Sequence, residues 1–181
     1  MPMRIDCGDF ELRPWQEGDQ PHLVRHANDR EIWRNLRDQF PHPYRAADAD
    51  RWVRQAARQQ PVTDFAIVID GYPGGGIGVK LRADVERCSA EIGYWLGQTF
   101  WGRGIMASAV RAVTRYAMPT FQLTRLYAVS FAYNVRSHRV LEKAGYSHEG
   151  TLRRSAIKDG IVVDQRMYGI TDLDLESAGL P

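Results

Sequence analysis

In the first third of the chain, the spacing of apolar residues predicts one short strand followed by three helices. Residues 10–14 alternate apolar and polar positions, which is typical of a strand that carries Phe10 and Leu12 on one face and ends at Pro14. Residues with short polar side chains indicate where the helices begin. The predicted helices run from Asp19 towards Asn28, from Asp29 over Ile32, Trp33 and Leu36, and from Asp48 or a neighbour through Arg58.

From residue 64 the apolar period changes to two, which predicts a run of strands. Residues 64–70, 77–82 and 90–96 each alternate in this way. A glycine-rich turn is expected over residues 71–76. Strands joined by such short connections form an antiparallel meander.

The second half predicts alternating helices and strands that end in a hairpin. Ile105, Ala109, Val113 and Ala117 repeat at helical spacing, and Pro119 is expected to end that helix. A strand over 126–131, a helix over 134–143 that stops at Gly145, and a hairpin of 152–158 with 161–170 turned at Asp159-Gly160 complete the order. This order predicts an α/β or α+β fold, with one sheet and helices on its faces.

Composition places the chain among ordinary globular proteins. Its 181 residues are 44% hydrophobic and 25% charged, which suits a single domain over residues 1–181. Two cysteines, Cys7 and Cys88, provide neither a disulfide framework nor a metal motif, so no metal is expected. The N-terminus has no signal-peptide pattern and no stretch is long enough to span a bilayer, so a cytoplasmic location away from membranes is expected. A net charge of +2 gives no reason to expect nucleic-acid binding.

The loop between the third strand of the meander and the long helix is the leading candidate for ligand binding. Its sequence is Trp101-Gly102-Arg103-Gly104-Ile105-Met106. Glycines let backbone N–H groups approach a ligand closely, and a helix N-terminus attracts anions such as phosphate or pyrophosphate. A tight turn whose glycines serve only geometry explains the same residues.

Other glycine-loop sites fit the sequence less well. Gly102, Gly104 and Ala107 match a dinucleotide fingerprint. This fingerprint also needs a parallel strand–helix–strand unit and an acidic residue at the end of the next strand, about 20 residues further along the chain. Residues 126–131 contain no acid. Residues 74–78 lead into a strand and lack the Gly-Lys-Ser/Thr of a phosphate-binding loop. These two glycine-loop motifs are therefore disfavoured, and the loop 101–106 keeps a phosphate or pyrophosphate as its expected ligand.

With these residues in view, the chain resembles the Gcn5-related N-acetyltransferases, in particular the branch of ribosomal-protein N-terminal alanine acetyltransferases. The resemblance extends from about residue 9 to 171 and leaves 172–181 as a tail. Four segments carry it: residues 10–15, residues 90–96, the loop 101–106, and the block formed by 134–137, 141–146 and Glu149-Gly150.

The resemblance implies a mixed, mostly antiparallel seven-stranded sheet with helices on both faces, splayed between its fourth and fifth strands. Pantetheine would pair with the fourth strand at Trp95, Leu96 and Gly97. The loop would hold the pyrophosphate through Trp101, Gly102, Arg103, Gly104, Ile105, Met106 and Ala107, with most contacts from backbone amides. Asn134 would bond the pantetheine region of coenzyme A (CoA), and Ser137, one helical turn further along the same face, would also bind the cofactor.

The chain departs from the superfamily pattern where a general acid is usual. Leu141 occupies the position of the frequent catalytic tyrosine, and a leucine cannot protonate a thiolate. Ser137, Tyr133 or water would then protonate the thiolate, and Ser137 is the choice consistent with the branch. Trp101 and Met106 also differ from the usual superfamily residues, although both suit the branch.

Glu91 is the candidate general base, because it matches a glutamate of the fourth strand that some superfamily members use. A solvated or salt-bridged strand residue explains Glu91 equally well. His138 and Glu149 are further candidates for the base. The first helices, residues 41–44 and the closing hairpin are expected to bind the acceptor. Trp33, Phe40 and Tyr44 are candidates to line its pocket, although aromatic residues at such positions more often belong to the core.

The resemblance implies transfer of an acetyl group from acetyl-CoA to a primary amine, with a protein or peptide N-terminus as the expected acceptor. A small-molecule amine (an amino acid, a polyamine or an antibiotic) or another acyl-CoA remains open. So does an acyl-CoA-binding module without catalysis. A homodimer would fit this interpretation.

Overall fold

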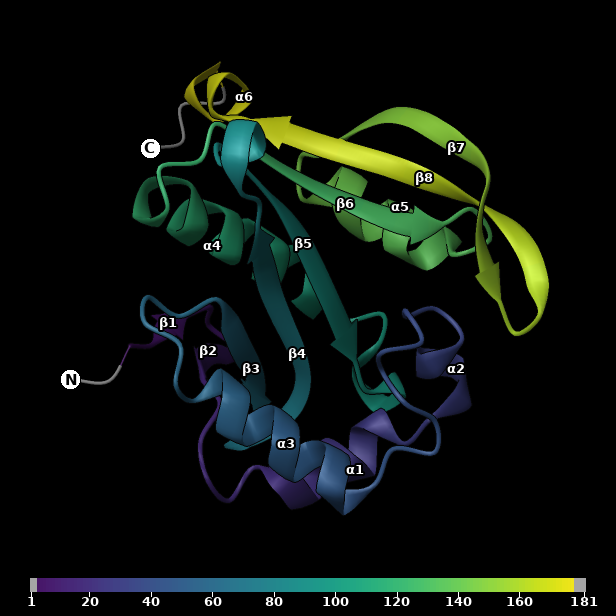
Figure 1. Ribbon diagram of the computed structural model, residues 1–181. Coiled ribbons are helices and arrows are strands. Elements are labelled where there is room, and N and C mark those ends of the chain that lie inside the picture. The colour runs from purple at the N-terminus through teal and green to yellow at the C-terminus, as the bar shows by residue number, and fades with distance from the viewer. Residues whose placement is uncertain (1–2, 178–181) are drawn as a thin grey trace. The chain divides into compact units, whose positions relative to one another are not determined.

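The computed structural model describes residues 3–177 and contains one eight-stranded sheet in the order β1-β2-β3-β4-β5-β6-β8-β7 (Figure 1). The strands are β1 (Ile5–Asp6), β2 (Glu11–Pro14), β3 (Asp64–Ile69), β4 (Tyr72–Leu81), β5 (Ser89–Leu96), β6 (Arg125–Phe131), β7 (Ser147–Lys158) and β8 (Ile161–Thr171). The helices are α1 (Gln20–Ala27), α2 (Arg30–Trp33), α3 (Ala46–Ala56), α4 (Ile105–Thr120), α5 (Val135–Lys143) and α6 (Asp172–Ser177). Two short 3-10 turns, Asp84–Glu86 and Gln98–Phe100, flank β5.

The predicted fold class is confirmed, with eight strands where seven were expected. The additional strand is β1, which pairs antiparallel with β2. Pairing is antiparallel from β1 to β4 and through β6, β8 and β7, whereas β5 and β6 are parallel. The register of β5 with β6 covers only Ser89, Ala90 and Glu91 of β5.

Several predicted boundaries were wrong. The glycine-rich turn expected over residues 71–76 is limited to Asp70 and Gly71, and β4 already begins at Tyr72. Pro119 lies inside the last turn of α4, which ends one residue later. Such small differences at helix ends are ordinary, because the last turn frays. The predicted tail contains α6, and residues 178–181 lie outside the described residues.

The chain forms two compact units, which are described separately. One consists of Met1–Gly78 with Tyr94–Ala109, and the other of Val79–Gly93 with Val110–Pro181. The prediction of a single domain stays a prediction. Among the helices of residues 3–177, none combines the length and the apolar character that crossing a bilayer requires.

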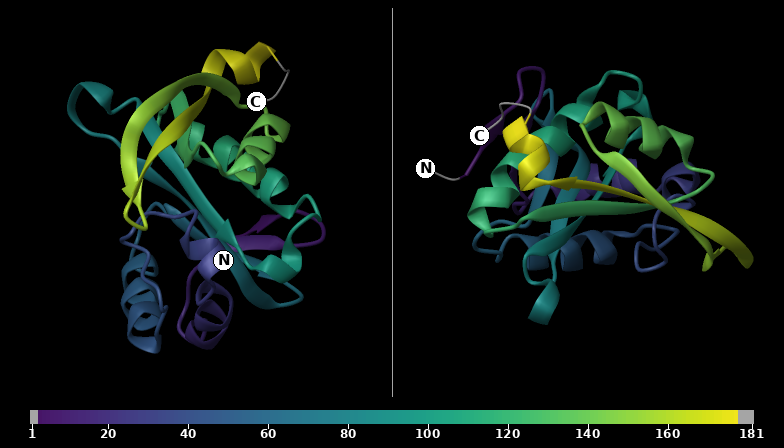
Figure 2. Two further views of the ribbon diagram at one scale, coloured as in Figure 1. Left: turned by 90° about the vertical axis from the view of Figure 1, so that its right-hand side faces the viewer. Right: turned by 90° about the horizontal axis from the view of Figure 1, so that it is seen from above.

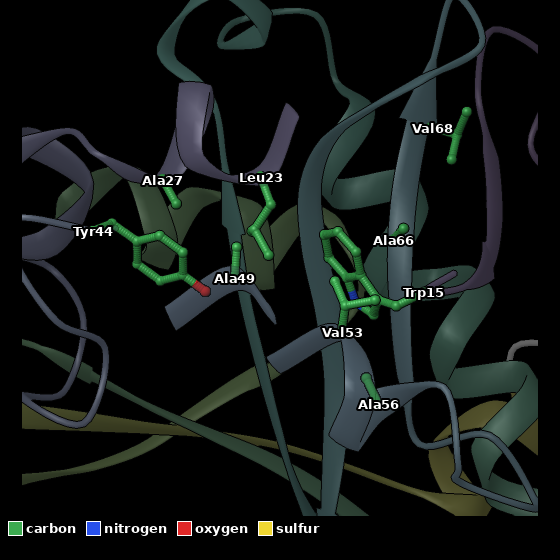
Figure 3. Close-up of a cluster of buried hydrophobic side chains, with 9 residues drawn as sticks. All are labelled: Trp15, Leu23, Ala27, Tyr44, Ala49, Val53, Ala56, Ala66 and Val68. Atoms are coloured by element: carbon green, nitrogen blue, oxygen red, sulfur yellow. The ribbon is translucent and has the colours of Figure 1, made fainter. Parts of the chain in front are cut away.

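The core of the first unit lies between α1, α3 and the sheet. Figure 3 shows Trp15 pointing towards residues of both α3 and β3. The Trp15 side chain is 1% exposed, so this large ring excludes water from the centre of the cluster. The buried members are Trp15, Leu23, Ala27, Tyr44, Ala49, Val53, Ala56, Ala66 and Val68.

A buried ion pair joins β2 to the start of α1. Arg13 donates to both carboxylate oxygens of Asp19, at 2.8 Å each. Asp19 is the N-cap residue of α1 as predicted, but its side chain does not cap the helix, because Arg13 and the Gln16 N–H occupy it. A bidentate pair satisfies both charges, which burial would otherwise make costly.

Three glycines of β4 allow its backbone to approach aromatic side chains. An ideal Cβ on Gly74 would lie 2.5 Å from Cε2 of Phe100, and one on Gly76 would lie 2.8 Å from Nε1 of Trp95. On Gly75 it would lie 2.5 Å from the backbone oxygen of Trp95. These glycines therefore serve close packing within a strand rather than a turn.

The second unit is dominated by the long twisted ribbon of β7 and β8, which pairs with β6 (Figure 2). Asp159 and Gly160 turn the ribbon with φ of 51° and 75°, as the predicted two-residue hairpin turn requires. Arg125 of β6 makes a bidentate pair with Glu149 of β7. The pair crosses over Gly169 of β8, where an ideal Cβ would lie 2.9 Å from the arginine.

Gly75→Ala should lower the free energy of unfolding by about 1–3 kcal/mol, because its Cβ would meet backbone that has to move. Gly93→Ala is the matched control. It also lies in a strand, it has no positive φ, and its Cβ would have nothing within 4 Å. Alanine should stabilise this position slightly, by about 0.4–1 kcal/mol. Urea unfolding of both variants tests the difference, and equal effects would contradict the close approach at Gly75.

The Arg125–Glu149 pair should contribute stability that depends on pH. The hydrogen bonds from Arg125 lower the pKa of Glu149 below its ordinary value of 4.5. A lowered folded-state pKa stabilises the protein above the ordinary value and is lost as pH falls through the folded value. Glu149→Gln should therefore reduce stability at pH 7, by at most about 1 kcal/mol because both side chains are about one-third exposed.

The difference between Glu149→Gln and the parent protein should disappear as pH falls below 4.5. Urea midpoints measured from pH 7 to pH 3 follow this change. Glu176→Gln removes an exposed carboxylate of α6 and should show a much weaker pH dependence. A difference for Glu149→Gln that stays constant over this range would refute the linkage.

Candidate functional site

The predicted phosphate loop has the backbone geometry that its glycines allow. Gly102 and Gly104 have φ of +81° and +78°, in the left-handed region that other residues rarely adopt. The first hydrogen bond of α4 runs from the Ser108 N–H to the Gly104 oxygen. The N–H groups of Ile105, Met106 and Ala107 consequently have no acceptor within the helix.

Only the backbone of this first helical turn is available to a ligand. The side chains of Ile105, Met106 and Ala107 are buried, with 5–7% exposed, whereas Gly102, Arg103 and Gly104 are exposed. The arrangement is a cradle of amides at the positive end of a 16-residue helix, with a cationic side chain in the loop before it. Such a cradle suits a phosphate or pyrophosphate.

Contacts of the Trp101 and Arg103 side chains hold the loop in place. The indole Nε1 of Trp101 donates to the backbone oxygen of Leu96 at 2.7 Å. The guanidinium of Arg103 lies 5.6 Å from the ring centroid of Phe100, and Phe100 packs on the bare backbone of Gly74. Trp101, expected as a binding residue, is therefore also a structural link between the loop and β5.

At the end of β5 the backbone of a single residue points away from β4. The Gly97 N–H donates to the Gly74 oxygen at 2.8 Å, and the Trp95 oxygen points towards Gly75. Because backbone groups alternate along a strand, the N–H and C=O of Leu96 face the other way. The Leu96 oxygen accepts from Trp101, which leaves the Leu96 N–H as the backbone donor of residues 95–97 that faces away from β4.

In the second unit, Asn134 and Ser137 are directly connected. The Asn134 Oδ1 caps α5 by accepting the Ser137 N–H at 3.2 Å. Nδ2 of Asn134 has no hydrogen bond to any residue between 3 and 177, so it can donate to a ligand carbonyl. Both side chains are half-buried, whereas Leu141 is fully buried and Tyr133 is stacked on Phe131.

The three carboxylate and histidine candidates for a base differ in their surroundings. Glu91 receives a hydrogen bond of 3.4 Å from Arg82, which also donates to the Tyr127 hydroxyl at 2.5 Å. Glu149 is held by both nitrogens of Arg125, and its lowered pKa makes it a poor proton acceptor. Burial lowers the pKa of His138, which stacks on Tyr168 with only 2% of its surface exposed. The ion pair of Glu91 with Arg82 is longer than that of Glu149 with Arg125, so Glu91 is the less tightly held of the two carboxylates.

Within one unit the structure brings the end of β5 and the loop together. Within the other it connects Asn134 with Ser137, and Glu91 with Arg82 and Tyr127. Arg82 and Tyr127 were not among the predicted site residues. Tyr127 lies opposite Glu91 in the parallel pair, and their side chains share a face, but this register is set by the fold and has no local sequence signal.

Comparison with known proteins identifies the family. Residues 9–147 match the model of the acetyltransferase (GNAT) domain. The chain is 30% identical over 133 residues to the putative ribosomal N-acetyltransferase YdaF of Bacillus subtilis, covering 74% of this chain and 72% of YdaF. It is 32% identical over 101 residues to the [ribosomal protein uS5]-alanine N-acetyltransferase of Escherichia coli, covering 54% of this chain and 52% of that protein.

Some matches cover only part of the other protein. The chain spans about half of the probable N-acetyltransferase YjcK of Bacillus subtilis, with 40% identity over 88 residues and 49% of each chain covered. Among solved structures, the ribosomal L7/L12 α-N-protein acetyltransferase RimL in complex with CoA superposes with a TM-score of 0.81 at 20% identity. That match covers 93% of this chain and 98% of RimL, and it supports the fold.

The predicted resemblance to the ribosomal-protein acetyltransferase branch is thereby confirmed. The matched range 9–147 contains residues 10–15, 90–96 and 101–106 and most of the fourth block. The chain belongs to the Gcn5-related N-acetyltransferase family.

Proposed function

We propose that this protein transfers an acetyl group from acetyl-CoA to a primary amine. The observation that carries the proposal is the amide cradle of residues 102–107, where two glycines of positive φ precede the exposed start of α4. A solved acetyltransferase of the same fold, MccE, is in complex with acetyl-CoA and AMP, and RimL is in complex with CoA. Both support acetyl-CoA as the donor.

The cradle would hold the pyrophosphate of acetyl-CoA through the amides of residues 102–107, with Arg103 adding a positive charge. The outward N–H of Leu96 would donate to the thioester oxygen and stabilise the negative charge that develops there. The Trp95 oxygen belongs to the same peptide and points towards Gly75, so this N–H points away from β4. Trp101 holds the next peptide through its bond to the Leu96 oxygen. Trp95 and Gly97 contribute packing and the pairing with β4 that keeps the strand end in place.

Transfer requires the neutral amine nitrogen to attack the thioester carbon while the carbon–sulfur bond breaks. A proton leaves the nitrogen, and a proton must reach the departing thiolate. Glu91 would accept the first proton, directly or through water, after exchanging its contact with Arg82 for the amine. Ser137 would supply the second, since the tyrosine position of the superfamily is a buried leucine here. Asn134 would hold a pantetheine carbonyl through Nδ2.

The acceptor that the relatives favour is the N-terminal amine of a protein. The names of the uS5-alanine N-acetyltransferase and of RimL describe acetylation of ribosomal proteins. The fold alone does not determine the acceptor, because related sites acylate chemically different amines. A protein or peptide N-terminus is therefore the first substrate to test.

Thermal unfolding with acetyl-CoA, succinyl-CoA, CoA and NAD, followed by thiol release against amines and N-terminal peptides, tests this function. Stabilisation by acetyl-CoA and release of CoA with a peptide are expected. Stabilisation by NAD alone would contradict the proposal. Turnover only with small amines or only with another acyl-CoA would change the substrate, and tight CoA binding without turnover would indicate a binding module.

Gly104→Val should raise the dissociation constant of acetyl-CoA at least tenfold, about 1.4 kcal/mol. A β-branched side chain is strained at φ of +78° and would displace the amides that bind phosphate. Gly8→Val is the control, because Gly8 has φ of +84° in a loop outside the site. Calorimetric titration should show normal affinity for the control. Unchanged affinity in folded Gly104→Val would contradict the phosphate role.

Glu91→Gln and Ser137→Ala separate the two proton transfers. Removing a general base or acid typically reduces kcat by about 10²–10⁴-fold. Glu91→Gln should keep acetyl-CoA affinity within about twofold, because the amide cradle is unchanged, and Ser137→Ala should change this affinity far less than kcat. Steady-state kinetics with the best peptide acceptor measure both quantities. Normal kcat in either variant would remove that residue from the mechanism.

A further inference from the structure

The segment that leads into the cofactor loop is attached to the junction between α1 and α2. Gln98 Nε2 donates to Asp29 Oδ2 at 2.7 Å, although the two residues are 69 positions apart. The His26 ring lies 5.3 Å from the Phe100 ring, and an ideal Cβ on Gly97 would be 2.8 Å from His26 Nδ1. Residues 97–100 therefore rest directly on the end of α1 and the start of α2.

Asp29 uses its second carboxylate oxygen to hold α2. Oδ1 accepts the Glu31 N–H at 2.8 Å, which is the N-cap of this helix. With only four residues, α2 gains little from its own hydrogen bonds and depends on its cap and on the buried side chain of Ile32. The same carboxylate therefore connects the loop segment and a marginal helix.

The helix α2 carries a residue of the predicted acceptor region. Trp33 is its last residue, and its ring lies 5.6 Å from the ring of His42. His42 belongs to residues 41–44, and next to them Phe40 contacts both Tyr44 and Trp95. A change in the order of α2 would consequently reach the aromatic side chains expected near the amine.

We propose that Gln98 is a positioning residue that couples the cofactor loop to α2 through Asp29. This inference rests on the proposed function. Binding of a pyrophosphate restricts the loop and with it Gln98, so that the Asp29 carboxylate and the cap of α2 are held more firmly. Coupling between two sites is reciprocal, so acceptor binding near α2 would also strengthen the binding of CoA to the loop.

Amide hydrogen exchange with and without CoA measures this coupling without a known acceptor. In the parent protein, CoA should slow exchange at least fivefold both in residues 102–108 and in residues 29–36. Gln98→Glu places a second carboxylate beside Asp29 and should abolish the CoA-dependent protection of 29–36. Protection of 102–108 should remain, because the amide cradle is unchanged.

A double variant that exchanges the carboxylate and the amide of this pair should restore the coupling. In Asp29→Asn with Gln98→Glu, the asparagine Oδ1 still caps α2 and its Nδ2 donates to the new carboxylate, so protection of 29–36 should return. Gln55→Glu is the matched control for charge. It lies exposed on α3 and has no side-chain hydrogen bond among residues 3–177, so coupling should be normal.

The outcomes distinguish the coupling from the function on which it rests. Absence of CoA protection at both segments of the parent protein would overturn the proposed function and the coupling together. Protection at 102–108 without protection at 29–36 would overturn the coupling and leave the function standing. Normal coupling in Gln98→Glu, or failure of the exchanged pair to restore it, would overturn the role of this hydrogen bond.

Discussion

The close approach permitted by Gly74, Gly75 and Gly76 is the constraint on which the cofactor side of this protein depends. A side chain at any of the three would overlap atoms of Trp95, Leu96 or Phe100. Without that approach, the Gly97 N–H could not reach the Gly74 oxygen, and Phe100 could not lie under Arg103. The orientation of the Leu96 amide and the position of the loop thus follow from a part of the chain that touches no ligand itself.

The same glycines show where prediction of the fold from sequence fails. Glycine clusters usually mark turns, and a strand interior loses entropy when it contains them. Only the packing of Trp15, Trp95 and Phe100 around β4 makes them favourable, and these aromatic residues lie 19 to 61 positions from the glycines that they contact. The burial of Arg13 was not predicted for a similar reason. A charged residue on a strand is expected to be exposed unless its partner, here Asp19, is known.

Neighbouring residues in the sequence were sufficient to predict features that depend on a short stretch of backbone. Gly102, Gly104, Gly145 and the Asp159-Gly160 turn all adopt the positive φ that their positions suggested. Asn134 was expected on a helix facing a ligand, and its carbonyl caps that helix while its Nδ2 is left to donate. The partners of Glu91 could not be inferred in this way, since they depend on the register of three strands that come from distant parts of the sequence.

The division of labour between backbone and side chains explains why the family is recognisable at low identity. The proposed cradle would use backbone amides, and the side chains of Ile105, Met106 and Ala107 are buried. Such a site would need only two glycines, an apolar helix and a well-packed strand end, so most other positions could change without loss of the proposed ligand. Selection of the acceptor would instead depend on side chains. The aromatic residues that follow α2 could select an acceptor only if their positions are fixed. In the proposed coupling, an occupied loop would hold the Asp29 cap through Gln98 and so order α2, whose four residues gain little from their own hydrogen bonds.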